Sequence, residues 1–92
     1  PNSVVLDLKT IKRKYPEARI IVLKDNFNTF KNVANCLESI IPRMSRKRSW
    51  GLSVELDMDG STEVWIGPLE QAELYHQRLR CKGLTLAPIE KI

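Results

Sequence analysis

The feature that most constrains the fold is an apolar stripe of helical spacing that starts at Phe30 and stops before Pro42. Apolar residues recur at i, i+3, i+4 and i+7 intervals, which places them on one face of an α-helix. The stripe consists of Phe30, Val33, Ala34, Leu37, Ile40 and Ile41. Pro42 ends the helix, because proline lacks an amide hydrogen and clashes with the preceding turn. We therefore expect an amphipathic helix that buries this face in a core.

Length and composition limit that core to a single small domain. The chain has 92 residues, of which 42% are hydrophobic, and a net charge of +4. A chain this short cannot divide its apolar residues between two cores. No apolar run approaches the roughly 20 residues of a membrane span, and no signal-peptide pattern follows Pro1. Cys36 and Cys81 lack metal-ligand spacing, so reduced thiols in a cytoplasmic protein are the expectation.

Strand and helix patterns surround the amphipathic helix. The β-branched run within residues 19–24 predicts a buried strand. In the turn that follows, Asn28 or Thr29 can cap the helix. Ser45 predicts the start of a second helix, which runs towards Met58 and closes at Gly60.

The second half of the chain predicts strand, helix and strand. Residues 62–66 form a strand with Thr62, Val64 and Ile66 on one face. Pro68 suits the first turn of a third helix, and Gly83 closes it. The inner stripe of this helix is Leu69, Ala72, His76 and Leu79, with Leu74 and Tyr75 beside it. Residues 84–89 form a last short strand, which Pro88 marks as an edge or an end.

The predicted fold class is α+β, with the element order βααβαβ. A three-stranded antiparallel sheet packs with three helices in a small sandwich. The sandwich occupies residues 19–92, and residues 1–18 form an extension. The apolar residues of that extension are Val4, Val5, Leu6, Leu8 and Ile11.

Catalytic chemistry is not indicated. His76 is the only histidine and lies on the third helix, where a packed or half-exposed role is expected. No Ser or Cys has a matching His–acid pair, and no glycine-rich loop follows a strand. Asp57 and Asp59 stand without a His or Cys cluster, so a metal site is weakly supported. We expect no enzyme, no catalytic residues, no cofactor and no metal.

Four basic residues leave a nucleic-acid partner open. They are Arg43, Arg46, Lys47 and Arg48. Such a run can contact phosphates or an acidic protein, or it can form a solvated face. No aromatic residues interleave with it, so a base-stacking platform is not indicated.

Three segments resemble the ClpS adaptors of Clp proteases, in particular the second cyanobacterial type. Residues 22–30 resemble the family's strand and the Asn-Asp-Asp turn that opens its first helix. Residues 64–76 are similar to its second strand and third helix, and residues 83–88 to its closing strand. The resemblance implies a cytoplasmic adaptor for proteolysis that catalyses nothing. Such an adaptor follows the N-end rule: it binds proteins whose free amino terminus carries a large hydrophobic residue, an N-degron.

The resemblance also assigns a substrate pocket and a docking face. The pocket positions are Lys24, Asp25, Asn26, Asn28, Phe30, Ser53, Leu56, Asp57 and Leu84. Of the family's three ammonium-contacting residues only Asp25 is kept, since Lys24 replaces an asparagine and Asp57 a histidine. Glu70, with Glu73 nearby, matches the acidic position that contacts the amino-terminal domain of the Clp ATPase.

The altered pocket leaves several interpretations open. Asp57 can accept from the ligand's ammonium, or Lys24 can pair with Asp57 and close the pocket, or both can be solvated charges. The leading hypothesis is a Clp adaptor that delivers N-degron substrates through a modified pocket. The alternatives are a ClpS-fold regulator that has lost N-degron binding and a small basic nucleic-acid-binding domain.

Overall fold

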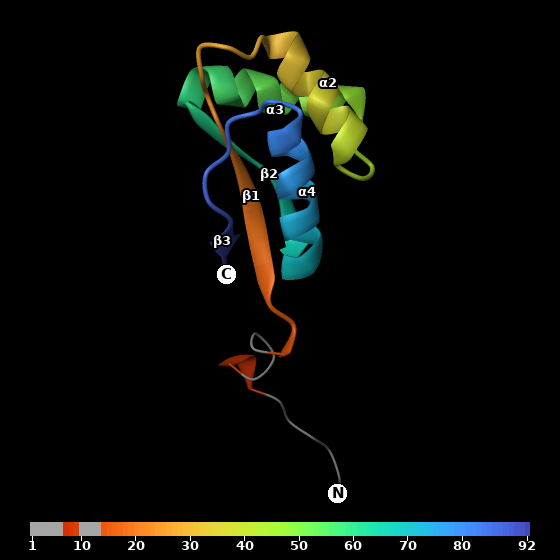
Figure 1. Cartoon of the computed structure of the whole chain (residues 1–92), viewed down its shortest axis with the longest axis vertical. Helices are drawn as coiled ribbons and strands as arrows, with labels where there is room; N and C mark the ends of the chain where they lie inside the picture. Colours follow the sequence, from red (N-terminus) through yellow and green to blue (C-terminus); the bar gives the residue numbers. More distant parts are fainter. Residues whose placement is uncertain (1–6, 10–13) are drawn as a thin grey trace, which may run out of the picture.

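The computed structural model describes residues 7–9 and 14–92 (Figure 1). From residue 17 onward the elements are β1 (Glu17–Leu23), α2 (Phe30–Ile40), α3 (Arg46–Asp59), β2 (Ser61–Pro68), α4 (Leu69–Cys81) and β3 (Glu90–Lys91). The predicted order βααβαβ is confirmed. Expectations for residues 1–6 and 10–13, among them Val4, Val5, Leu6 and Ile11, lie outside the described residues. β1 already includes Glu17 and Ala18, the last two residues of the predicted extension.

The three strands form one antiparallel sheet in the order β2-β1-β3. β1 pairs with β2 from Glu17 opposite Pro68 to Leu23 opposite Ser61. Side chains of β1 alternate between buried and more exposed positions, and Ala18, Ile20 and Val22 are 0–1% exposed. The buried side chains of this central strand thus belong to the hydrophobic core. The predicted α+β sandwich is confirmed.

A β-bulge in β2 changes one predicted face. Ile20 lies opposite Trp65 and Ile21 opposite Glu63, so Val64 is an extra residue on the β2 side. An extra residue shifts the alternation of every side chain beyond it. Ile66 is therefore 50% exposed, and the prediction that it shares a face with Thr62 and Val64 is wrong.

The last predicted strand is also corrected. Within residues 84–89, regular pairing reduces to a single bridge between Leu86 and Val22. The strand β3 comes later, at Glu90–Lys91, where it pairs with Ala18 and Arg19 of β1. Pro88 lies between the bridge and the strand, and because it has no amide hydrogen it cannot donate to the ladder. The segment thus follows β1 throughout but pairs with it in two pieces.

α4 lies along the sheet, and α2 and α3 pack together across the end where β1 stops (Figure 1). The amide of Leu69 donates to the carbonyl of Pro16, which fixes the start of α4 beside the start of β1. Ala72 and Leu79 of the inner stripe are fully buried, whereas Leu74, expected beside it, is 42% exposed. His76 is half-buried, as predicted, and its Nε2 lies 2.9 Å from the carbonyl of Ala87.

Helix ends follow from short polar caps and from glycine. Thr29, rather than Asn28, is the N-cap of α2, since its hydroxyl accepts from the amide of Asn32 at 3.0 Å. Ser45 caps α3 in the same way, through the amide of Arg48. Gly60 closes α3 with a φ of 83°, a left-handed conformation that glycine adopts without strain.

Two further boundaries differ slightly from the predictions. α3 continues one residue past Met58, and Pro68 is the N-cap of α4 rather than a residue of its first turn. Within the described part of the chain, no helix has the length and apolar character that crossing a bilayer demands.

Candidate binding pocket

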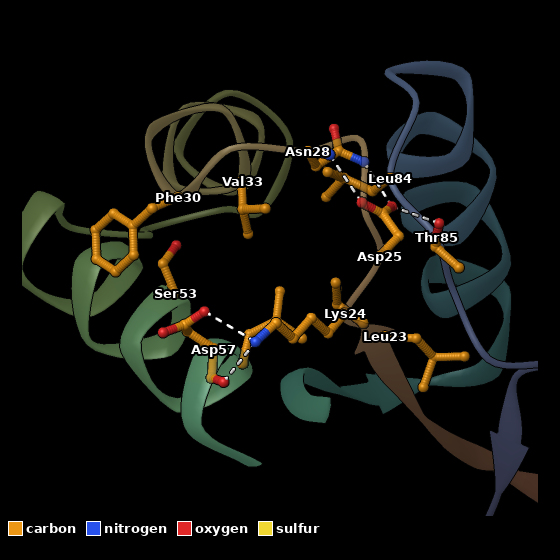
Figure 2. Close-up of a pocket in the computed structure, with 12 residues that line it drawn as sticks. Leu23, Lys24, Asp25, Asn28, Phe30, Val33, Ser53, Asp57, Leu84 and Thr85 are labelled. Carbon is orange, nitrogen blue, oxygen red and sulfur yellow. Dashed lines mark hydrogen bonds and ion pairs between the residues drawn. The ribbon is translucent and has the colours of Figure 1, made fainter. Parts of the chain in front are cut away.

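A pocket lies between the end of β1, the first turn of α2, the second half of α3 and the segment after α4 (Figure 2). Eight of the nine predicted pocket residues line it: Lys24, Asp25, Asn28, Phe30, Ser53, Leu56, Asp57 and Leu84. The ninth, Asn26, is exposed and lies outside the lining. The assigned positions, which span 60 residues of sequence, therefore meet around one hollow.

The inner wall of the pocket is apolar. Val33, Leu56 and Leu84 are each at most 6% exposed and come from three different segments. Phe30 forms one side, and its ring lies 4.7 Å from that of Trp50, centroid to centroid. The cavity volume is about 60 Å³. An enclosed dry cavity of about 150 Å³ holds benzene, whereas this hollow is smaller and open to solvent at its mouth.

Ser53 adds a polar atom to this wall. The residue is 2% exposed, and its hydroxyl oxygen has no hydrogen-bond partner among the described residues. A buried hydroxyl without a partner costs stability. The unpaired hydroxyl marks a place where a ligand or an ordered water can form a hydrogen bond.

Asp25 organises the mouth of the pocket. Its Oδ1 accepts from the amides of Phe27 and Asn28, at 2.9 and 2.7 Å. Its Oδ2 accepts from the Asn28 side chain at 2.8 Å and from the Thr85 hydroxyl at 2.6 Å. Together these bonds, with Thr85 contributing most, hold the pKa of the Asp25 carboxyl far below its ordinary value. The carboxylate is thus a structural anchor with both oxygens occupied.

Lys24 reaches across the mouth to α3. Its ammonium lies 3.0 Å from Oδ1 of Asp57 and donates to the Asp57 carbonyl at 3.0 Å (Figure 2). The Lys24 amide donates to the carbonyl of Gly60, which holds the backbone of Lys24 beside the end of α3. A cation here also interacts favourably with the carboxyl end of the helix. The structure thus contains the ion pair between Lys24 and Asp57 that one of the three interpretations proposed.

The ion pair is nevertheless accessible to solvent. The side chains of Lys24 and Asp57 are 51% and 70% exposed. Exposed pairs contribute only about 0–1 kcal/mol. The pair therefore occupies the mouth without sealing it.

Four lining residues were not predicted: Val22, Leu23, Val33 and Thr85. Val33 belongs to the amphipathic stripe, and Val22, Leu23 and Thr85 lie in segments of the resemblance, so each carried a signal that did not mark it as a pocket residue. Val22 and Leu23 end a strand that reads as buried throughout. Which of its side chains meets the pocket depends on how the helices pack.

The predicted docking residues lie on a different part of the molecule. Glu70 and Glu73 are exposed on α4, and Glu70 is in its first turn. Because α4 starts beside the start of β1 and the pocket lies at the other end of β1, the two surfaces are at opposite ends of the sheet (Figure 1).

The basic residues near α3 are partly engaged in local contacts. Nε of Arg46 lies 3.1 Å from Glu38, and Nη1 of Arg48 contacts the sulfur of Met44 at 3.8 Å. Both cysteines are free thiols, and burial raises the pKa of Cys36. Among the described residues, no three or more His, Cys, Asp or Glu side chains are placed to hold a metal ion.

Known proteins resemble this chain along most of its length. The family model described as "ATP-dependent Clp protease adaptor protein ClpS" matches residues 13–86. The ClpS adapter of Synechocystis sp. (strain ATCC 27184 / PCC 6803 / Kazusa) is 52% identical over 82 residues, which cover 89% of this chain and 84% of that protein. The ClpS adapter of Thermosynechococcus vestitus (strain NIES-2133 / IAM M-273 / BP-1) is 47% identical over 91 residues, with 98% and 97% covered.

A solved structure shares the fold. "The structure of Agrobacterium tumefaciens ClpS2 bound to L-phenylalaninamide" matches with a TM-score of 0.76, over 84% of this chain and 98% of that one. At 18% sequence identity this likeness concerns the fold alone. With the family model and the cyanobacterial relatives, the conclusion about identity is direct: this chain belongs to the ClpS family of Clp protease adaptors.

Proposed function

We propose that this protein docks on the amino-terminal domain of a Clp ATPase and delivers substrates whose hydrophobic amino-terminal residue enters the pocket of Figure 2. The observation that carries the proposal is the pocket itself, an apolar hollow with charged groups at its mouth. Burying an aliphatic side chain against Val33, Leu56 and Leu84 supplies the affinity. The charges at Lys24 and Asp57 orient the amino terminus of the residue that carries this side chain.

The fold neighbour supports the choice of ligand. The Agrobacterium tumefaciens protein was solved with L-phenylalaninamide, a single hydrophobic residue. In this chain the cavity of about 60 Å³ favours a leucine-sized side chain as the first residue.

Docking is assigned to Glu70 and Glu73. Both carboxylates are exposed on α4 and lie away from the pocket. A charged rim residue contributes to steering and specificity when the partner surface is complementary. Glu70 also complements the amino-terminal end of the helix dipole, so a test must separate docking from helix stability.

Degradation of a reporter tests the whole proposal. A fluorescent protein beginning with Leu, or with Asp as the control, is incubated with a cyanobacterial Clp ATPase–protease. We expect this adaptor to accelerate loss of the Leu reporter alone. Ser53→Leu fills the pocket and Glu70→Lys reverses the docking charge, so each should abolish the acceleration. Glu55→Lys, an equal charge change at an exposed site on α3, should retain it.

Equal acceleration for reporters that begin with Leu and with Asp would contradict delivery through the pocket. Retention of activity by Glu70→Lys, with its helix content unchanged by circular dichroism, would contradict the docking assignment.

One observation favours a second candidate function. The Lys24 ammonium already bonds Asp57 at the pocket mouth, as expected for a ClpS-fold regulator that occupies the ATPase without carrying substrate. That candidate predicts normal binding to the ATPase together with slower degradation of substrates brought by another adaptor. The reporter assay separates the two, since a regulator never accelerates loss of the Leu reporter.

A further inference from the structure

The outer face of α3 carries an apolar stripe that is exposed to solvent. Trp50, Val54 and Met58 recur every four residues and are 37%, 46% and 77% exposed. Residues four apart lie on one side of a helix, whereas the pocket residues Ser53 and Leu56 of the same helix are buried. Contiguous exposed apolar surface is typical of an interaction site. The proposed function leaves this face of α3 unused.

Gly51 lies beside the stripe and leaves room for a close approach. It is exposed, and a Cβ added there would meet no heavy atom within 4 Å. The positive-φ glycines of the described residues are Gly60 and Gly83, so the backbone of Gly51 does not require glycine either. A glycine inside a helix costs stability relative to alanine. What Gly51 provides is an open site where the backbone of a second helix can come close.

The charges of α3 run against its own helix dipole. The first turn contains Arg46, Lys47 and Arg48 without an acid, and the last turn contains Asp57 and Asp59 without a base. Acids favour the start of a helix and bases its end, which is the arrangement in α4. An antiparallel neighbour of the same sequence would place each basic first turn beside an acidic last turn.

Two exposed charges show how such a neighbour aligns. Arg48 and Glu55 are about two turns apart, so they lie along the same edge of the stripe. Among the described residues Glu55 forms no ion pair, and Arg48 contacts only the sulfur of Met44. In a two-fold pair of antiparallel helices, Arg48 of each copy meets Glu55 of the other. The midpoint between these two positions falls next to Gly51, so the helices cross where their backbones can come closest.

The other edge of the stripe fits the same alignment. Arg46 and Asp57 are about three turns apart, and their midpoint is again next to Gly51. Both are already paired within the chain. Arg46 lies 3.1 Å from Glu38, and Asp57 lies 3.0 Å from Lys24. This edge therefore contributes less than the first, but a single two-fold axis satisfies both.

We propose that α3 is a self-association surface, on which two copies of this chain pair antiparallel across Gly51. Trp50 and Val54 of each copy bury apolar area against the other, and the pairs between Arg48 and Glu55 fix the direction. One helix face is smaller than the standard interface of about 800 Å² per partner, so the dimer is weak and depends on concentration. Neither the inner wall of the pocket nor Glu70 takes part, so delivery by a single copy does not depend on this contact.

Charge reversal tests the alignment. Sedimentation equilibrium of the full chain from about 1 µM to about 1 mM covers the range expected for a small interface. Arg48→Glu and Glu55→Arg each bring like charges together and should weaken self-association about 10-fold. An equimolar mixture of these two variants should form a heterodimer with wild-type affinity, because each copy brings the charges that the other needs. The variant with both changes should recover wild-type affinity as well.

Two further variants serve as controls. Lys91→Glu reverses an exposed charge on β3, which pairs with the start of β1, away from α3, and should associate as the wild type does. Gly51→Ala separates the contact from the stability of the helix. Alanine is the better helix former, so this variant should unfold at a higher temperature and yet associate several-fold more weakly.

The outcomes decide the inference. A wild type that stays monomeric at every concentration overturns it, and so does a mixture that associates no more tightly than its two components. If Arg48→Glu and Glu55→Arg instead weaken binding to the ATPase domain, the face belongs to that partner and not to a second copy. Recovery in both the mixture and the double variant supports the antiparallel pair. Circular dichroism of each variant establishes that folded proteins are being compared.

Discussion

Asp25 links parts of the chain that are 60 residues apart. Its carboxylate joins the turn after β1 to Thr85, which follows α4. Asn28 strengthens the link, because its side-chain amide donates both to Asp25 and to the carbonyl of Gly83. The ionised side chain of Asp25 thus holds the mouth of the pocket together through hydrogen bonds within the chain itself.

The ionisation of Asp25 predicts an acid-dependent loss of stability. Its pKa is held below the ordinary value of 3.8 in the folded chain, so the unfolded chain binds the proton more readily. The stabilisation is therefore complete above about pH 4 and is lost as the pH falls towards the folded pKa. We expect Asp25→Asn to lower the free energy of unfolding at pH 7 but to flatten its decline between pH 5 and pH 3.

Urea denaturation at a series of pH values measures this. Asp59→Asn, at the exposed end of α3, is the control and should follow the wild-type profile. A profile for Asp25→Asn that parallels the wild type would show that another group causes the decline.

At the scale of elements, two caps of the same type act on different parts of the molecule. Thr29 begins α2 directly beside Phe30, a pocket residue. Ser45 begins α3 two turns before Ser53, the first α3 residue in the lining. Both hydroxyls accept from a first-turn amide at 3.0 Å. Their contributions to stability should therefore be similar, and their effects on the pocket should differ.

We expect Thr29→Ala and Ser45→Ala each to lower the free energy of unfolding by about 1 kcal/mol. In peptide titrations, only Thr29→Ala should weaken binding beyond what the loss of folded protein explains, because the first turn of α2 forms the pocket wall. Equal effects on binding from both variants would mean that the pocket senses overall stability rather than the local cap.

The elements show which features a sequence reveals. The stripe of α2, the caps and Gly60 are local signals, and they placed the helices to within a residue or two. The bulge at Val64 and the gap at Pro88 depend on how a neighbouring strand pairs. No pattern within residues 62–66 contains that information, so Ile66 was assigned to the wrong face.

The candidate pocket shows the same division. Its positions came from the resemblance, and the structure gathers eight of them, but the role of each residue stays a prediction. Sequence left the state of Lys24 and Asp57 open, because pairing across 33 residues depends on the geometry at the end of β1. The contact between Thr85 and Asp25 is equally non-local. The division of the chain at residue 18 also stays a prediction.

At the scale of the whole molecule, the lengths of β1 and α4 separate the pocket from the carboxylates of Glu70 and Glu73. β1 has seven residues and α4 thirteen, and each spans about 20 Å at its usual rise. Both elements start at the Glu70 end and run towards the pocket. A side chain bound in the pocket therefore does not contact Glu70 or Glu73.

This separation predicts that the two surfaces act independently. Lys24→Met should leave affinity for the ATPase domain unchanged within about twofold, and Glu70→Lys should do the same for peptide affinity, since distant sites add within about 0.5 kcal/mol. Calorimetric titration of the double variant against both ligands completes the cycle. A coupling larger than that would mean that one site alters the conformation of the other.

The hydrogen bond between Thr85 and Asp25 also has a consequence for folding during synthesis. Helices α2 and α3 are local, and a growing chain can form them early. The pocket cannot exist at that stage, because Leu84 and Thr85 have not yet been synthesised. Its last wall closes only when Thr85 is brought to Asp25, 60 residues earlier in the chain, after helices α2, α3 and α4 have all been synthesised. A nascent copy of this protein is thus unable to capture a ligand in this pocket until its synthesis has passed Thr85.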